Sequence, residues 1–122
     1  MNWSATGAIL LALAVILGAF GAHGLRDRLD AYRMGVYEKA VFYHFIHAVM
    51  LFILSGRSPI PRGPWVSLVM GIAIFSGSLY LLALTNQRWL GAITPLGGLS
   101  FIVGWLWLMI APGSASKRSS MD

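Results

Sequence analysis

The chain has 122 residues, of which 57% are hydrophobic and only 11% are charged. A soluble domain usually carries roughly 25% charged residues, and a chain this short cannot cover so much apolar surface in water. The composition argues against a soluble enzyme, a disordered chain and a soluble nucleic-acid binder. We therefore expect a single domain that is integral to a lipid bilayer.

Cysteine is absent, and the net charge is +5. The lack of cysteine excludes disulfides, thiolate metal sites and thiol catalysis. The basic residues stand in short patches between apolar runs, where Lys and Arg set orientation and meet anionic headgroups. The sequence has no basic stripe with interleaved aromatic residues, so we expect no nucleic-acid partner.

Four apolar runs without charges follow one another along the chain. A spanning helix needs roughly 20 mainly apolar residues, and only the second run falls short. That run suffices if its helix starts near Val36, with Glu38 and Lys39 in the headgroup zone. The prediction is an all-α membrane bundle of four transmembrane helices within residues 1–112, followed by a polar, disordered tail over residues 113–122. The expected spans are Trp3–Ala22, Val36–Ser55, Pro64–Leu84 and Leu90–Ala111.

Four spans place both termini on one side of the membrane, here called the terminal side. The opposite side, called the turn side, holds the connections after the first and third spans. Tryptophan favours membrane–water interfaces. Trp3, Trp65, Trp105 and Trp107 fall toward the terminal side, and Trp89 falls at the turn side. Lys and Arg are divided almost evenly between the two sides, with three of the four acidic residues near the turn side. We expect the terminal side to be cytoplasmic.

The connection after the first span has apolar residues at helical spacing. Leu25, Leu29, Tyr32 and Val36 share one arc, and charged residues fill the other. This pattern predicts a short amphipathic helix that lies in the membrane surface. We expect a connector that caps the bundle, with contact to a lipid headgroup or a partner as the alternative.

Small residues recur at helical spacing in three of the predicted spans. Helices in lipid gain little from hydrophobic burial, and close backbone approach through small residues provides dispersion contacts instead. We therefore expect these stripes to be helix contacts, within one chain or between chains. The stripes are Ala14, Gly18 and Ala22; Ala73 and Gly77; and Gly97, Ser100 and Gly104.

Pro95 lies inside the fourth apolar run. Its ring removes the helical hydrogen bond to the Gly91 carbonyl and clashes with that turn. Either the helix kinks at Pro95, or Pro95 begins the regular helix after a looser entry over residues 90–94. Thr94 is placed to satisfy part of the freed backbone.

Polar residues at membrane depth are the main functional candidates, because each needs a partner away from lipid. Counting about 1.5 Å per residue from Val36, His47 reaches the depth of Ser76 and Ser100. These three residues form a candidate polar layer near the midplane. We expect His47 to point inward and to bond Ser76, Ser100 or Tyr80. The remaining polar candidates lie nearer the turn side and are His23, Tyr43, His44, Ser78 and Tyr80.

His44 and His47 are three residues apart on one predicted helix, a spacing that permits adjacent metal ligands. Two axial haem ligands must instead approach from opposite faces, and no carboxylate lies at depth. We expect no metal or other cofactor, and no catalytic residues, because the sequence has no nucleophile–base–orienter set, phosphate loop or paired carboxylates. The polar layer is interpreted as structural, with a proton or small-ligand role as the alternative.

Several short motifs occur together along nearly the whole chain. They are Gly18-Ala19-Phe20-Gly21-Ala22-His23, Tyr43 with His47-Ala48, Phe75-Ser76-Gly77-Ser78-Leu79-Tyr80, Thr94-Pro95-Leu96-Gly97-Gly98 and Gly104-Trp105. This pattern resembles the family of small four-span bacterial inner-membrane proteins that includes YgdD and YwdK. The resemblance implies a four-span fold in a bacterial cytoplasmic membrane and supplies no reaction, because the family is one of unknown function. His44 departs from the family pattern, which commonly has Gln there.

The expected function is that of a non-enzymatic structural, accessory or interaction protein in the lipid bilayer, as a homo-oligomer or with another membrane protein. A small transporter or proton-linked channel that uses His47 and Pro95 is the second hypothesis. A binder of a lipophilic ligand or cofactor is the third. A channel or carrier often shows inverted repeats, and the two halves of this sequence show no convincing repeat.

Overall fold

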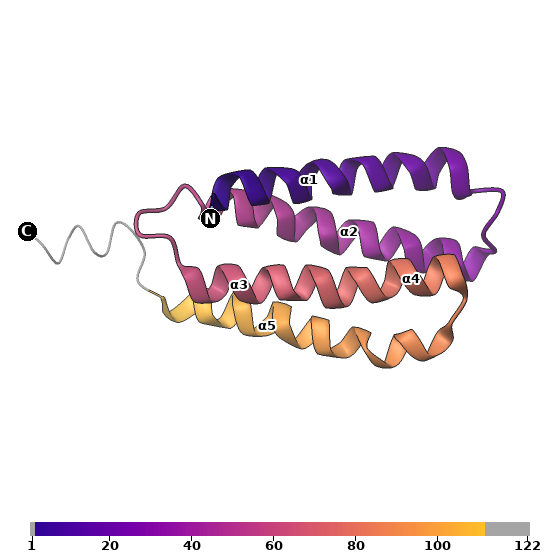
Figure 1. The fold of residues 1–122 in the computed structure, drawn as a ribbon. Helices are drawn as coiled ribbons and strands as arrows, with labels where there is room; N and C mark the ends of the chain where they lie inside the picture. Colours follow the sequence, from indigo (N-terminus) through magenta and orange to yellow (C-terminus); the bar gives the residue numbers. More distant parts are fainter. Residues whose placement is uncertain (1, 112–122) are drawn as a thin grey trace, which may run out of the picture.

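The computed structural model describes residues 2–111. These residues fold into four long helical segments that run up and down, and they contain no strand (Figure 1). The elements are α1 (Trp3–Phe20), η1 (Gly21–Leu25), α2 (Ala31–Leu54), α3 (Arg62–Gly71), η2 (Ile72–Ser76), α4 (Gly77–Thr85), η3 (Arg88–Ala92) and α5 (Thr94–Ile110).

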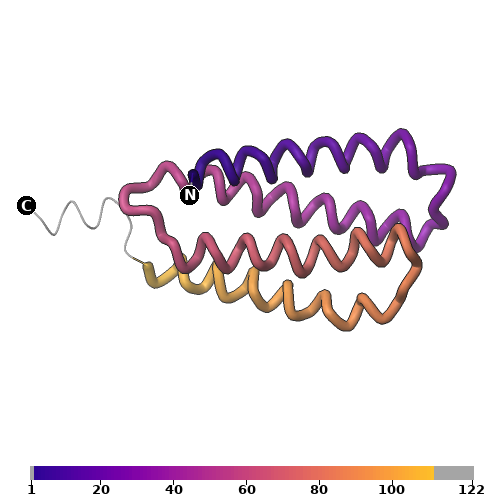
Figure 2. The backbone as a smooth tube through the Cα atoms, viewed as in Figure 1, coloured from indigo at the N-terminus to yellow at the C-terminus, as the bar shows by residue number. Residues whose placement is uncertain are grey.

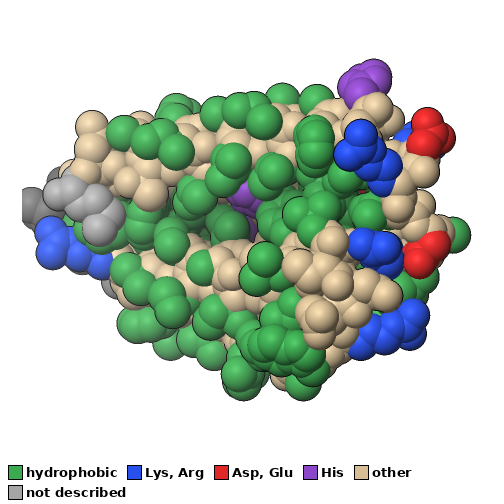
Figure 3. All heavy atoms as spheres, turned by 45° about the vertical axis from the view of Figure 1, so that its right-hand side comes forward, with side chains coloured by type: hydrophobic (Ala, Val, Ile, Leu, Met, Phe, Trp, Pro, Cys, Tyr) green, Lys and Arg blue, Asp and Glu red, His purple; other side chains and the backbone are tan. Residues whose placement is uncertain are grey.

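The four segments are long and apolar enough to cross a membrane. They are Trp3–Leu25, Ala31–Leu54, Arg62–Thr85 and Arg88–Ile110. In Figure 3 hydrophobic side chains cover the middle of the molecule, and charged side chains gather at its ends. The predicted all-α bundle of four transmembrane helices is confirmed. The predicted disordered tail, residues 113–122, lies outside the described residues.

The helices form two closely packed pairs. Helix α1 lies along α2, and α5 lies along α3 and η2, while α2 joins the pairs by packing against η2 and α4 (Figures 1 and 2). The start of α1 and the end of α5 lie at the same end of the bundle (Figure 1). The outer helices therefore each keep a broad face that no other described helix covers, and exposed Ile9 and Leu99 lie on these faces.

An apolar core lies toward the terminal side, and Trp65 of α3 holds three helices together there. The Trp65 side chain is 2% exposed, and its ring meets that of Trp3 edge-on at a centroid distance of 4.6 Å. Its indole N–H donates to the Leu51 carbonyl of α2 at 3.2 Å. The buried members of this core are Ala48, Leu51, Leu54, Trp65, Leu68, Ile72 and Phe101.

The connection after the first span differs from the predicted amphipathic helix over residues 25–36. The first span continues through η1 to Leu25, and a short turn then leads to Asp30, which caps α2. The Asp30 carboxylate accepts from the Arg33 N–H at 2.7 Å, satisfying a free donor at the positive end of the helix dipole. Residues 31–36 therefore extend the second span, and the prediction of a separate surface helix is wrong.

The Arg33 side chain fastens this turn to the end of the third span. Its Nε donates to the Ala83 carbonyl at 2.7 Å, and its Nη2 donates to the Leu84 carbonyl at 3.2 Å. These carbonyls belong to the last turn of α4, where helical partners are missing. Asn86 ends that helix in the left-handed region, at φ 58°, a common way to stop a helix.

Pro95 lies in the first turn of α5, directly after the 3-10 helix η3. The missing N–H of proline is harmless there, because the first N–H groups of a helix have no intrahelical partner. Pro95 thus begins the regular helix and does not kink its interior, so the looser-entry alternative holds and the kink is wrong. The Thr94 hydroxyl donates to the Leu90 carbonyl at 3.3 Å.

The small-residue stripe of α5 is a helix contact, as predicted. A Cβ atom added to Gly97 would lie 2.2 Å from the Phe75 backbone nitrogen. One added to Gly104 would lie 2.8 Å from a methyl carbon of Leu68. Only glycine allows α5 to approach the third span this closely.

The predicted stripe on the third span has a different outcome. No atom lies within 4 Å of a Cβ added to Gly77, and Ala73 is exposed. Gly71 makes the close contact instead, because an added Cβ would lie 2.3 Å from the Phe101 ring. The third span thus makes a close contact through a small residue, as expected, but helical spacing predicted the wrong face of the helix for it.

Candidate functional site

Two buried histidines, one helical turn apart on α2, organise the polar groups at membrane depth. His44 is 2% exposed and His47 is 5% exposed. His44 bonds groups of α1 and α4, whereas His47 bonds a group of α5. The prediction that His47 points inward is confirmed.

His44 joins three helices in a closed cluster, defined here as His44, Tyr80 and Tyr37 with their carbonyl partners. The His44 Nε2 lies 2.8 Å from the Leu10 carbonyl of α1, and its Nδ1 lies 2.8 Å from the Tyr80 hydroxyl of α4. The Tyr80 ring meets the Tyr37 ring at 5.4 Å, and the Tyr37 hydroxyl donates to the Leu17 carbonyl. The cluster therefore links α1, α2 and α4 through groups that satisfy one another.

His47 joins α2 to α5 in a different way. The Trp105 indole N–H donates to the His47 Nε2 at 3.0 Å. The His47 Nδ1 lies 2.7 Å from the Tyr43 carbonyl, one turn earlier on the same helix. The Phe101 ring stacks on the imidazole with a centroid distance of 3.7 Å and an interplanar angle of 14°. Both ring nitrogens and one ring face are therefore occupied.

These partners fix where each imidazole holds its proton. The Leu10 carbonyl only accepts, so the His44 Nε2 carries the proton, and in the neutral ring the Nδ1 accepts from Tyr80. The Trp105 indole only donates, so the His47 Nε2 is unprotonated and the Nδ1 donates to the Tyr43 carbonyl. The two neutral histidines are therefore opposite tautomers.

The serines of the predicted midplane layer do not reach His47. The Ser76 hydroxyl donates to the Ala40 carbonyl at 2.8 Å, and the Ser100 hydroxyl donates to the Ser67 carbonyl at 2.7 Å. Each serine therefore joins its helix to the backbone of a neighbouring helix. The structure does not bring the three predicted residues together as one layer, and His47 bonds neither the serines nor Tyr80.

The last two candidates lie toward the turn side. The Ser78 and Thr94 hydroxyls are 2.6 Å apart and join α4 to the start of α5. His23 lies in η1 with an exposed side chain. It is separate from the two buried histidines, because it lies near the end of the first span.

A lateral groove opens beside His47 between α2 and α5. Its volume is about 440 Å³. Aromatic rings make up much of its wall. The groove is lined by Tyr43, Ile46, His47, Phe75, Gly98, Phe101, Ile102 and Trp105.

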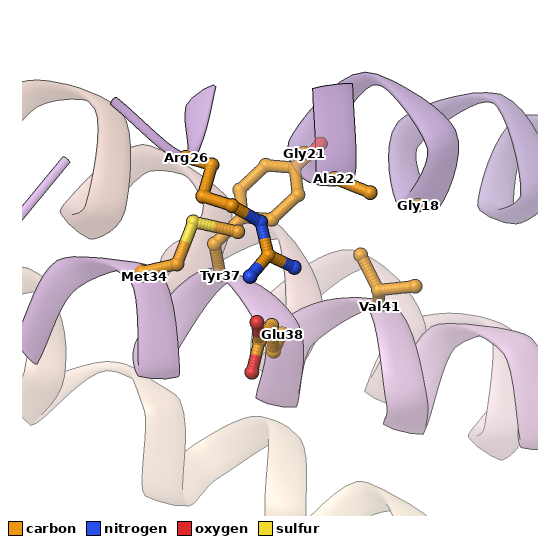
Figure 4. A pocket seen from close by; sticks show the side chains of 8 residues that line it. All are labelled: Gly18, Gly21, Ala22, Arg26, Met34, Tyr37, Glu38 and Val41. Carbon is orange, nitrogen blue, oxygen red and sulfur yellow. The ribbon is translucent and has the colours of Figure 1, made fainter. Parts of the chain in front are cut away.

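A smaller turn-side pocket of about 120 Å³ lies between the end of the first span and the start of α2 (Figure 4). The Arg26 guanidinium and the Glu38 carboxylate point toward one another across it, beside Tyr37 and Met34. The added Cβ of an alanine in place of Gly21 would lie 2.3 Å from the Tyr37 ring. This pocket is below the usual size of a site for a drug-sized ligand.

No three His, Asp or Glu side chains within residues 2–111 lie together in a way that could hold a metal ion. The two buried histidines use their ring nitrogens for hydrogen bonds instead. The arrangement can therefore hold helices together and, at the groove, present aromatic surface to the lipid phase.

Sequence reasoning missed Trp105 as a site residue, and it weighed His44 less than His47. The missing signal was the true start of α2. Counted from the observed starts of their spans, Ala31 and Arg88, His47 lies 16 residues along and Trp105 lies 17 residues along. A start at Val36 made the depth of His47 too shallow by about 8 Å, which pointed to the serines.

Comparison with known proteins gives a consistent result. Residues 17–98 match the family described as "Protein of unknown function (DUF423)". The UPF0382 membrane protein SSP2132 of Staphylococcus saprophyticus is 51% identical over 85% of this chain and 90% of its own length. The UPF0382 membrane protein YwdK of Bacillus subtilis is 45% identical over 86% of this chain and 90% of its own length. No solved structure matches.

The family match covers most of the chain, and the relatives are membrane proteins of nearly the same extent. The resemblance drawn from the sequence motifs is confirmed. The chain belongs to the DUF423 family of UPF0382 membrane proteins.

Proposed function

We propose that this protein is a non-enzymatic accessory protein of the bacterial cytoplasmic membrane, which binds a helix of another membrane protein along α1. The relatives are membrane proteins from bacteria, which supports the location. The proposed docking surface is one face of the first span, and the observation that carries it is the distribution of small residues around that helix.

Helix α1 has small residues on two separate faces. One face holds Gly7 and Ala14, which are buried against α2. A Cβ added to Gly7 would lie 3.0 Å from the Phe52 backbone nitrogen. This face shows how small residues bring two helices of this protein into backbone contact.

The second small face of α1 is exposed. Ala5, Ala8, Ala12 and Ala19 share one exposed arc of the helix, which Val15, 57% exposed, interrupts between the last two. We call these four alanines the alanine face. Small residues are enriched where membrane helices approach closely, and no described helix covers the alanine face. An added membrane helix would cover it in the way that α2 covers the opposite face.

A third face of α1 provides the contrast. Ile9, Leu13, Ile16 and Phe20 are bulky and between 42% and 66% exposed. Bulky apolar side chains suit contact with fluid lipid. The same helix therefore combines a lipid-type surface with a small-residue surface, which supports partner binding along one side only.

The buried polar groups support a structural role more than a proton-conducting one. The hydrogen bonds of His44 end on a backbone carbonyl and a tyrosine, and those of Ser76 and Ser100 end on backbone carbonyls. All buried side-chain polar atoms within residues 2–111 have a partner. A proton path needs groups that exchange partners, and these bonds link helices in fixed pairs.

The experiment uses the absence of cysteine from the chain. Ala12→Cys and, as the matched control, Leu13→Cys each receive a benzophenone maleimide in native bacterial membranes. After illumination we expect Ala12→Cys to give an adduct with another membrane protein, and Leu13→Cys to give lipid adducts alone. Lipid adducts alone at both positions would contradict the proposal. An adduct at twice the mass of the chain would show that the protein binds a second copy of itself, and it would contradict the accessory role.

We also propose that both termini are cytoplasmic. The two ends of the bundle should lie on opposite sides of the membrane. Reporter fusions after Ser116 and within residues 29–34 show which side each end is on. We expect a cytoplasmic readout after Ser116 and the opposite readout in the turn. The reversed pair would overturn the orientation and keep the four spans.

A further inference from the structure

The Tyr43 hydroxyl is a polar group at the middle of the membrane without a hydrogen-bond partner among residues 2–111. Tyr43 lies 12 residues after the start of α2 and 11 before its end, at a depth of about 17 Å from either side. Its side chain is 37% exposed and lines the lateral groove. Hydrocarbon offers the hydroxyl no acceptor, so an occupant with an acceptor would stabilise this arrangement.

The groove walls favour a flat occupant. The Tyr43 ring is within 9° of parallel to the His47 ring, and within 19° of parallel to the Phe101 ring. His47 and Phe101 are themselves stacked. His47 and Phe101 are only 5% and 4% exposed, so the aromatic surface open to an occupant is that of Tyr43 and Trp105, which are 37% and 41% exposed. Another planar ring stacks favourably on such a surface.

The size and opening of the groove fit a molecule that arrives through the lipid. A volume of about 440 Å³ lies within the usual range of roughly 300–1,000 Å³ for small-molecule sites. Gly98 leaves space in the wall, and Ile46 and Ile102 are 40% and 54% exposed at its edge. A lipophile therefore reaches the groove sideways, without crossing water.

We propose that the lateral groove binds a planar, lipophilic ring that carries a carbonyl oxygen, which is the chemistry of a membrane quinone head. The ring lies against the exposed aromatic side chains of the groove, and the carbonyl accepts a hydrogen bond from the Tyr43 hydroxyl. A simple acyl chain also fills apolar space, but it leaves the hydroxyl unpaired. The His47 ring is already bonded at both nitrogens, so its part is to hold Trp105 in the wall.

The test measures binding of decylubiquinone to the full chain in phosphatidylcholine nanodiscs, by quenching of tryptophan fluorescence. Empty nanodiscs provide the correction for partition into lipid. We expect saturable binding, and Tyr43→Phe should weaken it about fivefold, because it removes one hydrogen bond and keeps the ring. Tyr32→Phe is the matched control, because Tyr32 is 51% exposed at the turn side beside Arg88, and it should leave the affinity unchanged.

A second variant tests the groove itself. A Cβ added to Gly98 makes only ordinary contacts of 3.7 Å with Phe75, so Gly98→Leu should fill the groove in a folded protein and abolish binding. Gly77→Leu adds the same bulk in open space and should bind like the native chain. Non-saturable quenching, equal affinity of the native chain and Tyr43→Phe, or displacement of the quinone by an equal concentration of oleate would each overturn the proposal.

Discussion

His44 and His47 lie three residues apart on one helix, yet they belong to two different regions of the protein. His44 lies in the closed cluster, where α1, α2 and α4 surround it and its partners Leu10 and Tyr80 are half-buried. His47 lies at the lateral groove, where its partner Trp105 is 41% exposed. Buried histidines therefore have two roles in this bundle. One joins helices in its interior, and the other shapes a groove wall that lipid can reach.

The two regions also differ in how they respond to loss of a partner. In the closed cluster, a missing group leaves buried donors and acceptors that nothing else can reach, which is costly in a membrane. At the groove, the indole of Trp105 has room to turn toward other groups. The stability of the protein should therefore depend more on the closed cluster, and the access of ligands should depend more on the lateral groove.

The largest expected effect concerns the backbone contact that frames the groove. Gly97→Ala places a Cβ 2.2 Å from the Phe75 backbone nitrogen, so α5 must move away from the third span. We expect a loss of about 3 kcal/mol in the free energy of unfolding, measured by SDS titration in dodecyl maltoside. Gly77→Ala is the control, because open space surrounds that position, and a similar loss there would contradict the packing assignment.

The next effect concerns the closed cluster. His44→Leu leaves the Tyr80 hydroxyl without a partner and removes the additional hydrogen bond to the Leu10 carbonyl, so we expect a loss of about 2 kcal/mol in the same titration. Adding Tyr80→Phe should restore part of the loss, because it removes the orphaned hydroxyl. If the double variant is as unstable as the sum of the two single variants, the bond does not hold the cluster together.

A smaller effect is expected at the groove. His47→Leu removes the acceptor of the Trp105 indole but leaves that side chain near the lipid phase. The expected loss is about 1 kcal/mol, and the maximum of tryptophan fluorescence should shift as the indole N–H changes partner. A loss equal to that of His44→Leu would abolish the distinction between the two regions.

The number of spans was readable from the sequence because each crossing needs a long charge-free run, and four such runs are present. The start of α2 could not be read from the sequence, because Asp30 and Arg33 suggested a surface segment. In the structure Arg33 turns to the carbonyls at the end of α4. A charged side chain at the end of a span is thus compatible with a continuous helix when the free carbonyls of a neighbouring helix end accept its hydrogen bonds.

The partners of the buried residues were harder to predict for a geometric reason. Depth along a helix follows from counting, but the rotation of each helix about its axis does not. This uncertainty about rotation made Gly77 a predicted contact, whereas Gly71 is the residue that faces Phe101. The misplacement of Ser76 has the other cause, an error in depth, because Ser76 bonds Ala40 and does not lie at the level of His47 on α2.

The most direct test of the comparison is the tautomer of each buried histidine. We propose ¹⁵N solid-state NMR of the histidine-labelled protein in lipid bilayers, with His44→Leu and His47→Leu used to assign the signals. The account predicts a neutral ring with the proton on Nε2 for His44, and a neutral ring with the proton on Nδ1 for His47. The same tautomer at both positions, or a charged ring at either, would contradict it.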